Sequence, residues 1–243
     1  MTRKKLVVVA GDWDLVARSF VERYADRGAC LMTPRDLSQA GWSYRVGSPS
    51  DSTAMIAGRP LPACEIAGVH TRLPCVTARD LPHIAVADRA YVAEEMTAFL
   101  LAWFTELERP ALNPPMPQCL AGPYWPQEKW VHTAAQLGIA TAPSHRRICF
   151  PQDSASVADS GGDGAAVTVV GGKEIGNVDR ALHAAARALA DAAKAGLLVV
   201  RFSNRKPGAR FLGASHWADL GEPEIAEAVL QWFRNAKRSR RAR

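Results

Sequence analysis

The sequence has no run of apolar residues close to the length that a membrane-spanning helix requires. Of 243 residues, 48% are hydrophobic and 22% are charged, which is ordinary for a folded soluble protein. A transmembrane helix needs about 20 consecutive apolar residues. The basic start, MTRKKLVVVAG, contains an apolar run too short for a signal peptide. We therefore expect neither a membrane span nor a secretory signal.

Several motifs that mark common enzyme classes are also missing. The sequence has no GxGxxG, no Walker lysine and no GxSxG, so it does not indicate a dinucleotide site, a P-loop or a serine hydrolase. The six histidines form no HxH or HExxH pair, so no zinc site is indicated. The aspartates of the Ser/Gly/Asp-rich stretch 151–166, predicted to be a loop, lack EF-hand spacing. No metal ligands are predicted.

The cysteines do not form a recognisable framework. Their number is odd, they are widely spaced, and no two of them form a CxxC pair. This pattern favours reduced thiols and a cytoplasmic location. The five are Cys30, Cys64, Cys75, Cys119 and Cys149.

Positive charge is concentrated at the C-terminus. The last ten residues, RNAKRSRRAR, carry six Lys or Arg and no acid, so the other 233 residues account for none of the net charge of +6. We expect a solvated basic tail at 237–243. An electrostatic contact with nucleic acid or an acidic partner is the alternative. No aromatic residues interleave with these charges, so nucleic acid is the weaker partner.

The first 110 residues have the pattern of a small α/β domain. The β-branched run at 5–9 predicts a buried first strand, followed by a helix to about residue 25. Further strands are predicted at 29–32 and 66–73, and the longest helical pattern covers 88–108. These elements predict a Rossmann-like front domain with a parallel sheet. Arg72 lies at the carboxyl edge of the last strand, where ligands of open α/β sheets gather.

A proline-rich stretch at 110–143, PALNPPMPQCLAGPYWPQEKWVHTAAQLGIATAP, separates this domain from the rest. Its early prolines exclude helix and stiffen the chain. A short helix is predicted over 125–137, with Gly138 in the left-handed position that ends it. Lys129 is the only positively charged side chain on this helix. The pattern is typical of a crossing between domains.

The order Pro-x-x-Asn-Pro, helical Lys, Gly-Ile-x-x-Pro resembles the join between front and ATP-binding domains in ATP-grasp ligases. The peptide- and protein-modifying branch, such as ribosomal-protein glutamate ligase, is the most similar. The stretch VHTRLP is similar to that branch's x-Trp-x-Arg strand end, with His70 in the tryptophan place. The resemblance covers roughly residues 1–145. It implies a pre-ATP-grasp front domain at 1–110 and a reduced ATP-grasp-like α+β domain at 111–236.

The second half departs from the family pattern. By resemblance, Lys129 matches the first phosphate-binding lysine, but the second, in a Val-Lys-Pro strand, has no counterpart. Arg201 stands where the family has a metal-binding Asp, and 213–216 fill the Glu-x-Asn region. A guanidinium repels a divalent metal that needs oxygen ligands. The chain therefore resembles a degenerate ATP-grasp protein, shortened in its ATP-binding half.

Three readings follow for function. The first is a binding or accessory subunit of a peptide- or amino-acid-modifying pathway, with a peptide, a small carboxylate or a partner enzyme as its ligand. The second is an active ATP-dependent carboxylate–amine ligase with an atypical basic site, and the third is an unrelated α/β domain. The predicted cofactor residues, for ATP, are Lys129 and Lys173, and the predicted substrate residues are Arg72, Arg201 and His216. Catalytic residues, substrate identity and oligomeric state stay open.

Overall fold

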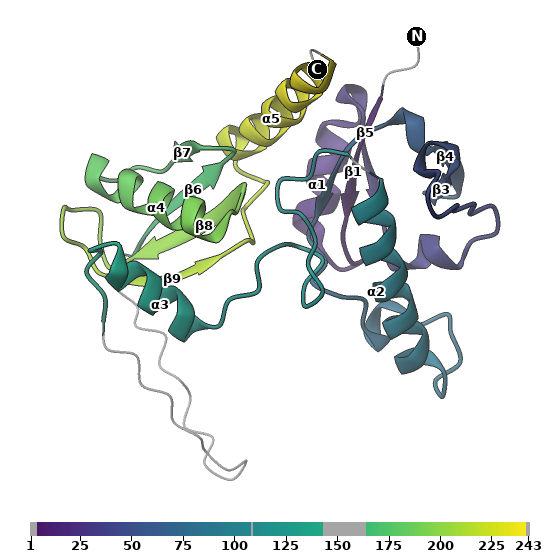
Figure 1. The fold of residues 1–243 in the computed structure, drawn as a ribbon, viewed down its shortest axis with the longest axis horizontal. Coiled ribbons are helices and arrows are strands. Elements are labelled where there is room, and N and C mark those ends of the chain that lie inside the picture. Colours follow the sequence, from purple (N-terminus) through teal and green to yellow (C-terminus); the bar gives the residue numbers. More distant parts are fainter. Residues whose placement is uncertain (1–3, 108, 143–163, 242–243) are drawn as a thin grey trace. The chain divides into compact units, whose positions relative to one another are not determined.

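The computed structural model describes residues 4–107, 109–142 and 164–241 and divides into two compact units (Figure 1). Unit 1 comprises Met1–Tyr124 and His216–Arg243, and unit 2 comprises Trp125–Ser215. No helix in the described ranges could cross a membrane. The strand predicted at 145–150, most of the 151–166 loop and the side chains of the basic tail lie outside the described residues.

Unit 1 is built on a three-stranded parallel sheet in the order β2-β1-β5. All pairings are parallel, with Val7 opposite both Cys30 and Val69. Because the central strand is flanked on both sides and buried, it reads as the continuous apolar run that parallel sheets require. The strands are β1 (Lys5–Val9), β2 (Ala29–Met32) and β5 (Ile66–Thr71). The α/β front domain predicted from sequence is therefore confirmed.

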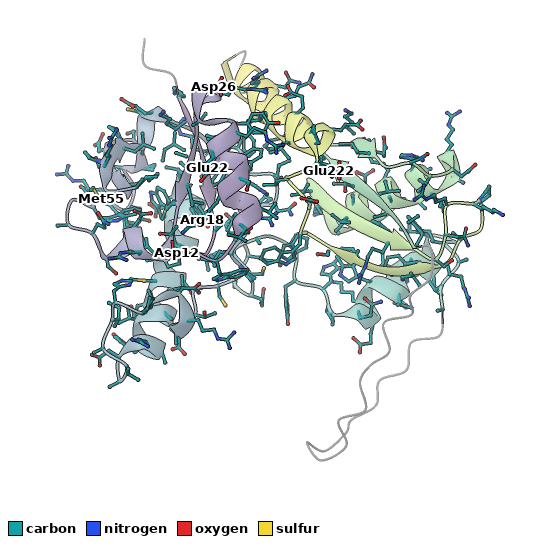
Figure 2. All side chains as sticks on the ribbon, turned by 180° about the vertical axis from the view of Figure 1, so that it is seen from behind. Asp12, Arg18, Glu22, Asp26, Met55 and Glu222 are labelled. Atoms are coloured by element: carbon teal, nitrogen blue, oxygen red, sulfur yellow. The ribbon has the colours of Figure 1, made fainter. Side chains whose placement is uncertain are left out.

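Helices surround this sheet, and a small hairpin precedes β5. The core joins the sheet residues Val7 and Ile66 to Leu100 and Trp103 of the long second helix. The helices are α1 (Leu15–Arg23), α2 (Arg89–Glu106) and α5 (Pro223–Arg241), and the hairpin strands are β3 (Thr53–Ile56) and β4 (Arg59–Pro62). Short 3-10 turns span Ala25–Arg27, Pro34–Ser38, Pro49–Asp51, Ala63–Glu65 and Ala78–Asp80. Exposed charged side chains, among them Arg18 and Glu22, lie along α1 (Figure 2).

The C-terminal helix α5 packs on unit 1, whereas the sequence placed residues 111–236 in the second domain. A Cβ built on Gly68 of β5 would lie 2.4 Å from the Phe233 ring. Only a strand position without a side chain admits such an approach. Arg27 also donates to Glu227 at 2.6 Å. Packing of the Phe233 ring on Gly68 therefore places α5 against the sheet of unit 1.

The proline-rich segment begins on unit 1 as well. The Val69 N–H donates to the Pro110 carbonyl at 3.0 Å, and Gly122, at φ +110°, lies against the Asn113 side chain. The chain enters unit 2 only at Trp125, later than the predicted boundary at 110–111. Hydrogen bonds and close packing hold residues 110–122 to the first unit.

Unit 2 is a four-stranded antiparallel sheet in the order β7-β6-β8-β9, covered on one face by two helices. Trp130 and Ala134 of α3 join Leu182 and Leu189 of α4 in its core. Asp179 caps α4 by accepting from the Ala181 N–H at 2.8 Å, as its position predicts. The strands are β6 (Ala165–Val170), β7 (Lys173–Ile175), β8 (Leu197–Phe202) and β9 (Phe211–Ser215), and the helices are α3 (Gln127–Gln136) and α4 (Arg180–Ala193).

Candidate functional site

Arg72 follows β5 directly and is almost completely buried, at 7% exposure. Its Nε donates to Asp14 Oδ2 at 2.7 Å and its Nη1 donates to the Ala218 carbonyl at 2.7 Å. Nη2 reaches Asp14 Oδ1 at 3.5 Å. The guanidinium also lies over the Trp217 ring, 5.3 Å from its centroid. Arg72 therefore joins the start of α1 to the segment that follows β9.

Asp14 was not recognised from sequence as a partner of Arg72. Its Oδ1 accepts from the Ala17 N–H at 2.9 Å and so caps α1, while the carboxylate neutralises Arg72. The pattern Gly-Asp-x-Asp before the helix indicates a cap, but nothing in it points to a residue 58 positions later. Both oxygens of this carboxylate therefore already accept hydrogen bonds from protein groups.

Two histidines lie beside this ion pair. The pKa of His70 is lowered to about 3, chiefly by burial, then by the positive charge of Arg72, and to a smaller extent by His216, while Asp14 opposes the shift. Burial and Arg72 also lower the pKa of His216. The Nε2 atoms of both rings are buried and have no hydrogen-bond partner among the residues that the structure describes. Both imidazoles are therefore neutral at neutral pH and keep unused hydrogen-bonding capacity.

Asp14, His70, Arg72, His216 and Trp217 together form what we call the polar cluster of unit 1, in which the first three are buried, His216 is partly buried and Trp217 is exposed. It brings together two predicted substrate residues, Arg72 and His216, that are far apart in the sequence. The cluster lies at the carboxyl edge of the parallel sheet, because Arg72 donates its backbone N–H to Val9, the last residue of β1. Ligands of open α/β sheets gather at this edge.

Lys129, the predicted phosphate lysine, is an exposed residue of α3. Its Nζ lies 4.1 Å from the centroid of the Trp125 ring, and the Trp125 and Trp130 rings are 4.6 Å apart. Contact with an aromatic face stabilises an ammonium by about 0.5–1 kcal/mol at an exposed site. The Lys129 amine therefore lies on the face of the Trp125 indole. A phosphate ligand that bound this amine would have to replace only this weak contact.

Lys173 and Arg201 extend from the sheet face of unit 2 that α3 and α4 do not cover. The strand register shows this, because residues directly opposite each other in neighbouring strands lie on the same face of a sheet. Lys173 pairs with Val170 and Arg201 pairs with Ala166, so each lies on the same face as its β6 partner. These positions are four residues apart on β6, which is roughly 14 Å along a strand. Lys173 and Arg201 therefore share a face but do not form one compact anion site.

Three carboxylates among the described residues of unit 2 already interact with protein groups. Glu174 and Asp191 are both paired with Arg187, at 3.2 and 3.4 Å, and Asp179 caps a helix. Within the described ranges, no three His, Cys, Asp or Glu side chains are grouped as a metal ion would require. Mg²⁺ prefers free carboxylate and phosphate oxygens, and these carboxylates already have protein partners.

No protein-family model matches this chain, and no curated protein sequence is significantly similar to it. Solved structures are similar. The macrocyclase MdnC from Microcystis aeruginosa MRC, bound to its precursor peptide MdnA, has 10% identity and a TM-score of 0.66, covering 96% of this chain and 100% of MdnC. The ATP-grasp ligase PsnB, complexed with a minimal precursor, Mg and ADP, has 13% identity and a TM-score of 0.64, covering 98% and 99%. This chain has the ATP-grasp fold.

A third structure agrees. A RiPP-associated ATP-grasp ligase from Chryseobacterium gregarium, in complex with ADP and a leader and core peptide, has 10% identity and a TM-score of 0.64, covering 96% of this chain and 97% of the ligase. The resemblance predicted from the Pro-rich join is confirmed for the fold. At these identities the likeness assigns no role to any side chain.

Proposed function

We propose that this ATP-grasp-fold protein is a binding or accessory subunit of a peptide- or amino-acid-modifying pathway, and that it lacks the MgATP-dependent ligase reaction. The observation that carries the proposal is Arg201. It lies on β8, exposed and paired with Gly213 of β9, where the family pattern has a metal-binding Asp. A fixed positive charge at that position opposes binding of a divalent cation.

The proposed ligand is a peptide or a small carboxylate. MdnC and PsnB were solved with precursor peptides, which supports a peptide partner for this fold. In the polar cluster of unit 1, the Nε2 atoms of His70 and His216, which have no partner within the described part of the chain, lie near the positive charge of Arg72. A carboxylate oxygen that accepted hydrogen bonds from Nε2–H would satisfy them. Arg72 positions the segment, since its own nitrogens already have partners.

ATP is a cofactor only under the alternative proposal, an active carboxylate–amine ligase with an atypical site. That alternative is favoured by Lys129, which matches the family's first phosphate lysine in position. In it, Lys129 and Lys173 would neutralise phosphate charge, and bound Mg²⁺ would polarise the phosphoryl group. The ion-paired carboxylates of unit 2 argue against this arrangement.

Turnover separates the two proposals. We expect no phosphate release above background when the full chain is incubated with ATP, MgCl2 and a synthetic peptide that carries Asp and Lys side chains. The Lys129→Ala variant is expected to give the same trace, and circular dichroism would show that it is folded. Magnesium-dependent phosphate release that Lys129→Ala abolishes would instead establish the ligase.

A further inference from the structure

Two cysteines line one pocket of unit 1. The pocket has a volume of about 340 Å³ and lies between α2, the loop that follows β5 and the segment 116–120. Cys75 and Cys119 both line it, with Thr97, Leu101 and Met116. We call it the dithiol pocket. Cys64 and Cys30 do not line this pocket, so they provide internal comparisons.

A backbone hydrogen bond joins the two cysteine-bearing segments. The Leu120 N–H donates to the Pro74 carbonyl at 2.7 Å. Cys75 follows Pro74 and Cys119 precedes Leu120, so each thiol is one residue from this bond. This bond holds the two segments side by side, and a disulfide needs Cα atoms roughly 4.4–6.8 Å apart. The two thiols are also close enough for the charge of one to affect the other.

The two thiols have different environments. Cys75 is exposed and Cys119 is buried. Burial has the largest effect and raises the pKa of the Cys119 thiol. The backbone N–H groups of Ala121 and Gly122 lower this pKa, whereas the neighbouring Cys75 raises it. When Cys75 enters a mixed disulfide its negative charge is lost, whereas the two N–H groups still stabilise a Cys119 thiolate. An exposed thiol has access to a dissolved disulfide, and a neighbouring thiol can then attack the mixed disulfide that forms.

We propose that Cys75 and Cys119 form a redox-active dithiol site that reacts with low-molecular-weight disulfides. The Cys75 thiolate attacks a small disulfide, forms a mixed disulfide and releases one small thiolate. Cys119 then attacks the Cys75 sulfur, forms the Cys75–Cys119 disulfide and releases the second thiolate. The two protein thiols are oxidised, one small disulfide is reduced to two thiols, and the protons pass to the released thiolates. The site is independent of the proposed binding function.

The test uses the reduced full chain with glutathione disulfide as the probe. Free thiols are blocked with N-ethylmaleimide at successive times, and each cysteine peptide is followed by mass spectrometry. We expect the glutathione adduct on Cys75 to be transient and replaced by a peptide linking Cys75 to Cys119. An intramolecular thiol acts at an effective concentration of millimolar or more. The Cys75 adduct should therefore disappear at least about tenfold faster than the adduct on exposed Cys64.

Serine variants distinguish the attacking thiol, Cys75, from the second thiol, Cys119. Cys119→Ser is expected to trap the glutathione adduct on Cys75 for as long as the Cys64 adduct persists. Cys75→Ser should leave Cys119 unmodified, because it is buried. Cys64→Ser is the matched control and should not change formation of the linked peptide. A persistent Cys75 adduct in the wild-type chain, or a disulfide from Cys75 to another cysteine, would overturn the proposal without bearing on peptide binding.

Discussion

Replacing Arg72 by methionine is expected to lower the free energy of unfolding of unit 1 by about 3–5 kcal/mol. The substitution leaves Asp14, at 5% exposure, as a buried carboxylate without its positive partner. It also removes the donor to the Ala218 carbonyl. The chain has two units, so two-state analysis of the whole protein does not apply. Hydrogen exchange of the β1 and β5 amides in urea would report the stability of unit 1.

A matched variant tests whether charge pairing is the cause. Arg72→Met combined with Asp14→Asn removes both charges and keeps an N-cap side chain, so it should recover a substantial part of the loss. Arg18→Met removes the exposed ion pair with Asp12, 3.4 Å apart (Figure 2), and should cost no more than about 1 kcal/mol. Equal losses for Arg72→Met and Arg18→Met would contradict the importance of the buried pair.

Acidification is expected to destabilise unit 1 through His70. The pKa of this histidine is about 3 in the folded chain, against an ordinary value of 6.5. The unfolded chain therefore takes up a proton as the pH falls below 6.5, while the folded chain does not. The stabilising contribution is complete above pH 6.5 and is lost as the pH falls toward 3. The slope is about 1.4 kcal/mol per pH unit, or about 2 kcal/mol between pH 6 and 4.5.

The variant His70→Leu removes this contribution. Its stability should be similar to that of the wild type at pH 7.5, where the imidazole is neutral, and should fall less on acidification. Hydrogen exchange in urea at several pH values gives both profiles. Parallel profiles for the two proteins would show that His70 does not take up a proton on unfolding.

Local patterns predicted much of the fold. Three predicted features depend only on residues close together in the sequence: the strand at Lys5–Val9, the strand at 29–32, and the helix over 125–137 that ends at Gly138. Each of them has a structural counterpart within two or three residues. The Pro-rich join predicted the ATP-grasp fold because its prolines and Lys129 stand in a family-specific order.

Long-range packing could not be predicted in the same way. Arg72 pairs with Asp14 and with Ala218, 58 and 146 residues away, and Gly68 receives Phe233 of α5. A glycine in a strand indicates a close approach but does not name the residue that approaches. For the same reason the domain boundary was placed at 110, whereas hydrogen bonds from Val69 and Leu120 hold the following segment on unit 1.

We infer from Arg201 that this ATP-grasp fold lacks a functional MgATP site. Isothermal titration calorimetry of the full chain with ATP, once with MgCl2 and once with EDTA, tests it most directly. We predict no magnesium-dependent binding, and any weak binding of ATP in EDTA should be lost in Arg201→Ala. Magnesium-dependent binding in the micromolar range would contradict this inference and support an active carboxylate–amine ligase.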